Sequence, residues 1–189
     1  MRRIIYAALF LFLVFSVGSC KKKKTDPTPT PTPTTPVDNG IFSATVSGAA
    51  FTPSSSKVVH TKSSFGTSNL YSFYFESKNT TTNKMMDFFL YSTTEFTPGT
   101  YTITLSNSGQ AYFFENKDLS NEKIWQAPKP ASSDLTHIYG TVVITEITTT
   151  RAKGNFNYTT YSYTGLTGAD STRVITNATF DVPLTRQGF

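Results

Sequence analysis

From residue 41 onward, apolar and polar residues alternate along short segments separated by glycine, proline, asparagine and serine. In the segment "IFSATVSG", Phe42, Ala44 and Val46 alternate with serine and threonine. A period of two places successive side chains on opposite faces, so each segment predicts a strand with one buried face. The longest alternation, "TRVITNATFDVPL", predicts one face made of Val174, Thr176, Ala178, Phe180, Val182 and Leu184, and another made of Ile175, Asn177, Thr179 and Asp181.

One segment departs from simple alternation. "KMMDFFLYST", residues 84–93, is apolar on both faces apart from Asp87, which predicts a central strand covered on two sides. Residues 117–136 contain Trp125 and the break "APKPA", show no alternation, and are predicted to form a loop. Further strands are predicted in "SKVVHT", "NLYSFYFES", "GTYTITL", "QAYFFEN", "THIYGTVVITEITTT" and "GNFNYTTYSYTG".

The composition agrees with this pattern. The chain holds 16 Phe and 10 Tyr among its 189 residues, and threonine is frequent. Aromatic and β-branched side chains fit a pleated, half-buried surface. We therefore expect residues 41–189 to form one all-β domain, an antiparallel β-sandwich of about eight or nine strands, with a partly closed β-barrel as the alternative.

The chain begins differently. Arg2 and Arg3 precede an apolar run, Ile4 to Val17, of 14 residues. That run is shorter than the roughly 20 residues of a membrane-spanning helix, so residues 1–19 are predicted to be a signal peptide. "VGSC", which ends at Cys20, resembles the lipobox of bacterial lipoproteins. The resemblance implies cleavage before Cys20, whose thiol then carries lipid (diacylglycerol, with chains such as palmitate). The alternative is an ordinary secretory signal that leaves a free thiol.

Residues 20–40 read as a linker between this anchor and the domain. Lys21 to Lys24 would lie beside the bilayer, either attracted to anionic lipid or solvated. The Thr-Pro repeat, residues 27–36, cannot form a helix or a strand ladder, because alternate residues lack an N–H. It is predicted to be an extended spacer.

A second resemblance covers most of the domain. "FSATVSGAAF", "GTYTITL" and "GTVVITEI", followed by "GNFNY" and "VITNATFDVPL", resemble outer-membrane lipoproteins of Bacteroidota-type bacteria. In that family a β domain ends in a strand, then G-x-F, then T-N-G-T-F. Ala178 stands where the family pattern has glycine. The resemblance implies a location and a fold, and no activity.

Charge and cysteine content narrow the function classes. The net charge of +5 comes mostly from the N-terminal segments, since residues 41–189 hold 11 Lys plus Arg against 10 Asp plus Glu. A nearly neutral domain without a basic stripe argues against nucleic-acid binding. With one cysteine in the chain, neither an intrachain disulfide nor a thiolate metal cluster can form.

Candidate chemistry is sparse. The two histidines, His60 and His137, lie in or beside strands, and no nucleophile elbow, zinc-protease motif or phosphate-binding loop occurs. "ENKDLSNE", residues 115–122, gathers oxygen ligands but lacks the glycine and spacing of a calcium loop, and is interpreted as a solvated loop. We therefore expect no catalytic residue, no metal and no cofactor.

Two further candidate sites complete the prediction. Trp125 and Tyr112 are candidate members of an aromatic platform for a ligand, although most rings in the domain are needed for the core. Ser171, in "DST", resembles the acceptor of bacterial O-glycosylation and falls in an expected loop.

The expected function is a non-catalytic lipoprotein of the outer membrane, with its domain on the cell surface or in the periplasm. It is anchored through Cys20 and binds a protein or glycan partner. A purely structural, envelope-assembly role and an enzyme are the alternatives.

Overall fold

The protein is all-β, as expected. The computed structural model describes residues 40–107, 109–130, 132–163 and 171–189. Within them, no helix is long and apolar enough to cross a membrane. The strands are β1 Ile41–Val46, β2 Ala49–Phe51, β3 Ser55–Phe65, β4 Ser68–Asn79, β5 Lys84–Ser92, β6 Gly99–Ile103, β7 Gln110–Glu115, β8 Lys123–Ala127, β9 Gly140–Ile147, β10 Arg151–Ser162 and β11 Thr172–Gln187.

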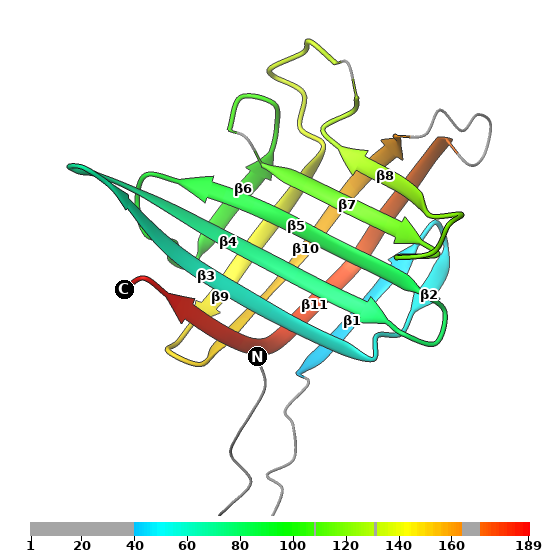
Figure 1. Ribbon diagram of the computed structural model, residues 1–189, viewed down its shortest axis with the longest axis horizontal. Coiled ribbons are helices and arrows are strands. Elements are labelled where there is room, and N and C mark those ends of the chain that lie inside the picture. The colour runs from blue at the N-terminus through cyan, green and yellow to red at the C-terminus, as the bar shows by residue number, and fades with distance from the viewer. Residues whose placement is uncertain (1–39, 108, 131, 164–170) are drawn as a thin grey trace, which may run out of the picture. The chain divides into compact units, whose positions relative to one another are not determined.

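The strands form one sheet that folds into two facing layers (Figure 1). We call β3-β4-β5-β7-β8 the front layer and β2-β1-β11-β10-β9-β6 the back layer. The layers join at two corners, where the end of β10 pairs with β8 and the end of β11 pairs with β3. The β11–β3 pairing is parallel, so the sheet is mixed rather than wholly antiparallel. The sheet has eleven strands, more than the eight or nine expected, because it includes short strands such as β2.

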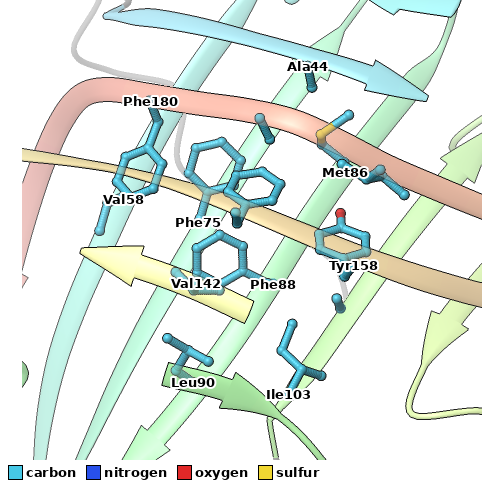
Figure 2. Packing of buried hydrophobic residues seen from close by; sticks show 14 of the residues in the cluster. Ala44, Val58, Phe75, Met86, Phe88, Leu90, Ile103, Val142, Tyr158 and Phe180 are labelled. Atoms are coloured by element: carbon cyan, nitrogen blue, oxygen red, sulfur yellow. The ribbon is translucent and has the colours of Figure 1, made fainter. Parts of the chain in front are cut away.

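Large aromatic rings from the two layers meet in the core (Figure 2). Phe156 of β10 lies 5.2 Å from Phe75 of β4 and 5.1 Å from Phe88 of β5, measured between ring centroids. Phe180 of β11 lies 5.4 Å from Phe75. Burying each such ring contributes about 2–3 kcal/mol, so these contacts stabilise the packing of one layer on the other.

A β-bulge in β11 corrects the predicted alternation. Asn177 has a positive φ of 52°, and the register with β1 slips between Ser43 and Thr45. An extra residue shifts every side chain before it to the other face. Residues 178–184 therefore alternate as predicted, whereas Val174 is 41% exposed and Ile175 is 0% exposed. The expectation for the residues before the bulge was wrong.

The expected loop at residues 117–136 contains a strand. β8 pairs with β7, and Trp125 lies opposite Phe113 in that ladder. The Trp125 ring is fully buried, 5.9 Å from the Phe113 ring and 4.1 Å from the Arg173 guanidinium carbon. The pairing with β7 and the burial of this one large side chain account for a strand where the local sequence lacks alternation.

Candidate functional site: the outer face of the front layer

The outer face of the front layer carries a cluster of large side chains. Alternation along β4, β5 and β7 turns Phe73, Phe75, Phe88 and Phe113 into the core and their neighbours outward. Cross-strand register then brings the outward residues side by side. We call this cluster the aromatic face and define it by Tyr74, Met85, Phe89, Tyr91, Tyr112 and Phe114.

The rings of the aromatic face stack on one another. Tyr74 and Phe89, paired across β4 and β5, have centroids 4.3 Å apart. Phe89 stacks on Tyr91 at 6.5 Å, and Tyr112 stacks on Phe114 at 5.8 Å. Most of these rings are half-buried, and Tyr91 is 37% exposed. Stacking holds the rings in place, so the face presents a preformed apolar surface.

The outer face of the back layer is different. Its outward positions on β1, β10 and β11 are mostly hydroxyl and amide side chains: Ser43, Thr45, Asn155, Asn157, Thr159, Thr176 and Thr179. Polar outward residues are the usual pattern in a sandwich, because that face meets water. The contrast marks the front layer as the unusual one.

Asp87 of β5 lies in the middle of the aromatic face. Its register partners are Glu76 on β4 and Tyr112 on β7. The residue is 4% exposed, and its Oδ1 atom has no hydrogen-bond partner. Burial raises the pKa of Asp87 to about 8, and the nearby charge of Glu76 adds to the rise, against Lys117 and Lys78. Asp87 is therefore mostly protonated at neutral pH.

Glu76 has the opposite protonation preference. Burial alone would raise its pKa, but the hydrogen bond from Tyr74 and the ammonium groups of Lys57 and Lys78 outweigh burial and lower it. The Tyr74 hydroxyl donates to Glu76 Oε2 at 2.6 Å, and the two lysine Nζ atoms lie 3.4 and 3.3 Å from Oε1. Glu76 remains ionised beside a neutral Asp87.

Two carboxyl groups with pKa values moved in opposite directions can serve as an acid–base pair. In this protein the unpaired Oδ1 of Asp87 has less than 1 Å² of accessible surface. A substrate could reach that atom only by displacing the surrounding rings. The arrangement therefore suits contact with a partner better than proton transfer.

The predicted platform of Trp125 and Tyr112 is not formed. Tyr112 faces outward opposite Gln126, whereas Trp125 faces inward opposite Phe113. Adjacent residues in a strand point to opposite faces, so these two rings lie on different sides of the layer. Tyr112 remains in the candidate site, and Trp125 belongs to the core.

The other predicted residues fall elsewhere. Cys20 lies outside the described residues. Ser171 is half-buried just before β11, beside a hollow of about 360 Å³ shared with Lys129 and Tyr161. His137 is exposed and contacts Tyr139, with ring centroids 4.4 Å apart, while His60 is fully buried.

The acidic segment at residues 115–122 is held by internal contacts. Lys117 Nζ lies 2.7 Å from Asp118 Oδ1 and 3.0 Å from Glu122 Oε2, and the same Oε2 accepts the backbone N–H of Asp118 at 2.8 Å. Lys117 Nζ also lies 5.2 Å from the centroid of the Phe114 ring. Within the described residues, no group of three or more His, Cys, Asp or Glu is placed to hold a metal ion.

No protein-family model, curated protein or solved structure matches the chain.

Sequence reasoning missed Tyr74, Phe89 and Tyr91 as members of a site. A signal for them was present in "KMMDFFLYST", whose second face is apolar apart from Asp87. That second face is the outer one, because β5 is covered by the back layer on its other side.

Proposed function

We propose that this protein is a non-catalytic lipoprotein of the outer membrane whose β domain binds a protein or glycan partner through the aromatic face. The aromatic face is the observation that carries the proposal. Its rings are half-buried apart from Tyr91, which is exposed, so they form a partly exposed apolar surface. Apolar surface patches mark interaction sites, and aromatic side chains dominate the energetic centres of interfaces. Lys57, Lys78 and Gln110 supply a polar rim around it.

The N-terminal segments support the membrane part of the proposal. The lipobox-like "VGSC" makes Cys20 the proposed lipid attachment site, and residues 21–40 form the proposed spacer. At about 3.1 Å per residue, an extended chain of that length reaches several tens of ångströms. A domain held off the bilayer on the cell surface or in the periplasm could meet a partner through its side.

The first experiment is proteinase treatment of intact cells, with a periplasmic protein as the leakage control. Removal of the domain from intact cells places it on the surface. Survival until the cells are broken places it in the periplasm. The same preparation analysed by mass spectrometry tests for lipid on Cys20, and an unmodified Cys20 contradicts the anchor.

A second experiment tests the aromatic face. A photoreactive phenylalanine analogue replaces Tyr91 in one strain and Val174 in a control strain, since both residues are exposed on opposite layers. We expect specific cross-links to a protein partner from position 91 only.

For glycan partners, affinity electrophoresis in gels containing envelope polysaccharide compares Tyr112→Ala with Val174→Ala. If neither assay distinguishes the two faces, the structural, envelope-assembly role is favoured instead.

A further inference from the structure

His60 of β3 occupies an unusual environment at the corner where β3 meets β11. Its side chain is fully buried, and neither Nδ1 nor Nε2 has a hydrogen-bond partner in the described structure. Four rings surround the imidazole, with centroids 4.7 to 6.3 Å away: Phe189, Phe96, Phe73 and Tyr71. A buried imidazole without a partner is costly and calls for a reason.

The ring nearest to His60 belongs to the segment that follows β11. β11 pairs with β3 only from Leu184 to Gln187, and this places Arg186 opposite His60. Gly188 then adopts a positive φ of 77° so close to β3 that a Cβ atom would lie 2.2 Å from the Lys62 carbonyl oxygen. This turn brings Phe189 over His60, where the residue is still 51% exposed.

Residues 186–189, which we call the latch, are held by the end of the β11–β3 ladder and by the side chains of Arg186 and Phe189. The Arg186 guanidinium lies 3.9 Å from the Phe189 ring centroid and forms an ion pair with Glu95. Phe189 contributes its contacts with His60 and Tyr71. Short ladders with exposed rings belong to the low-stability end of a structure, and the β11–β3 ladder covers four residue pairs beside a half-exposed Phe189.

The charged groups around His60 disfavour protonation of its imidazole, because Arg186 already places a positive charge nearby. The groups that face it are Arg186 from β11, Glu95 from the segment between β5 and β6, and Tyr71 from β4, while Lys62 follows on the same face of β3. Burial lowers the pKa of His60, Arg186 lowers it further, and Glu95 acts in the opposite direction. Glu95 is already engaged by Arg186.

We propose that residues 186–189 form an acid-released latch, which packs over neutral His60 and detaches when His60 takes up a proton. Opening admits water to both ring nitrogens and moves the Arg186 guanidinium away from the imidazolium. Because the open state binds the proton on His60 more tightly than the closed state, acid shifts the population toward the open state. The ratio of open to closed protein rises by about tenfold for each unit by which closure lowers the pKa of His60. The proposal concerns the fold and is independent of any partner.

Amide hydrogen exchange on the full-length protein at pH 7.5 and pH 5.0, corrected for intrinsic rates, tests the latch. We expect the amides of residues 185–189 to lose protection about tenfold or more at pH 5.0, while β4 and β5 keep theirs. His60→Phe should abolish this pH dependence. His137→Phe, which removes the exposed histidine, should leave it unchanged.

Three results would overturn the proposal: protection of residues 185–189 that is unaffected at pH 5.0, loss of protection to the same extent in His60→Phe, and loss that occurs only together with β4 and β5. Should His60→Phe fail to fold, Phe189→Ala provides a second test, because it removes the cover and leaves the imidazole in place. Titration of the His60 ring by NMR should then show its pKa moving up toward 6.5. An unchanged pKa contradicts the latch.

Discussion

Asp87 on β5 lies directly opposite Glu76 on β4, so two acidic side chains share one cross-strand position on the outer face. Like charges in such a pair are destabilising. The pair is tolerated because burial and Glu76 raise the pKa of Asp87 to about 8, while Tyr74 and two lysines keep Glu76 ionised.

This pair predicts a stability that falls in mild alkali. The folded protein holds the Asp87 proton up to about pH 8, whereas the unfolded chain releases it near 3.8. Between these two pH values the folded state binds more protons than the unfolded chain. The stabilisation that comes from the raised pKa of Asp87 is therefore fully present below pH 3.8 and is lost as the pH rises through 8. From pH 7 to pH 9 the loss should be about 1.4 kcal/mol.

Urea denaturation of wild type and Asp87→Asn at pH 7 and pH 9 measures this loss. The asparagine side chain cannot ionise, so the unfolding free energy of the variant should not show the decrease between pH 7 and pH 9 that wild type shows. Asp118→Asn is the matched control, because that carboxylate is 81% exposed and should leave the wild-type slope intact. Equal slopes in wild type and Asp87→Asn would mean that Asp87 is already ionised at pH 7.

Tyr158 of β10 connects the two layers by a hydrogen bond as well as by packing. Its hydroxyl donates to the backbone carbonyl oxygen of Tyr112 at 3.0 Å, and the residue is 2% exposed. Tyr158→Phe leaves this partly buried carbonyl without that donor, so we expect a loss of about 1–2 kcal/mol in unfolding free energy. Tyr161→Phe, on the same strand and half-buried, serves as the control. An unchanged urea midpoint for Tyr158→Phe would contradict a stabilising bond.

Gly154 of β10 provides close contact between strands. A Cβ atom at this position would lie 2.2 Å from the Val143 carbonyl oxygen and 2.6 Å from Phe180 Cζ. Gly154→Ala should therefore destabilise the fold by about 1–3 kcal/mol through strand displacement. At Gly99 the nearest atom would be 3.8 Å away, so Gly99→Ala should be neutral or slightly stabilising. Thermal denaturation of the two variants measures this difference. A lower melting temperature for Gly154→Ala but not for Gly99→Ala shows that the close approach of neighbouring atoms, and not the loss of backbone flexibility, limits Gly154.

Asn177 maintains the bulge that sets the register of β11. Its left-handed conformation suits glycine and asparagine, so Asn177→Gly should be close to neutral. Asn177→Val should cost about 1–2 kcal/mol, because a β-branched residue resists a positive φ. Asn155→Val is the control on an exposed site in β10, where valine should be tolerated. If urea denaturation finds the two valine variants equally stable, the bulge does not depend on Asn177.

Much of the fold follows from local patterns. The alternation in "IFSATVSG" predicted β1 with its buried Phe42, Ala44 and Val46, and the doubly apolar "KMMDFFLYST" predicted a central strand, as β5 is. The expectation that this strand is covered on two sides was wrong, because the back layer covers one face and the other face, with Tyr91, points outward. Two wrong predictions, the loop at residues 117–136 and the inward face at Val174, have a common cause. The strand around Trp125 and the reversed face at Val174 depend on neighbouring strands and on one bulge, and neither leaves a periodic signal in the sequence.

The sequence by itself determined an all-β domain, a nearly neutral charge and the placement of an apolar second face on β5, because side-chain period and composition are local properties. Only the tertiary structure decided which side of β5 faces outward, that Glu76 pairs with Asp87, and that residue 189 covers His60. Residue 189 follows β11, which is distant in the chain from the β3 strand of His60, whereas Glu76 and Asp87 meet through the register of two consecutive strands. Each relationship depends on how one strand is aligned with another, and the order of residues within a single strand does not specify that alignment.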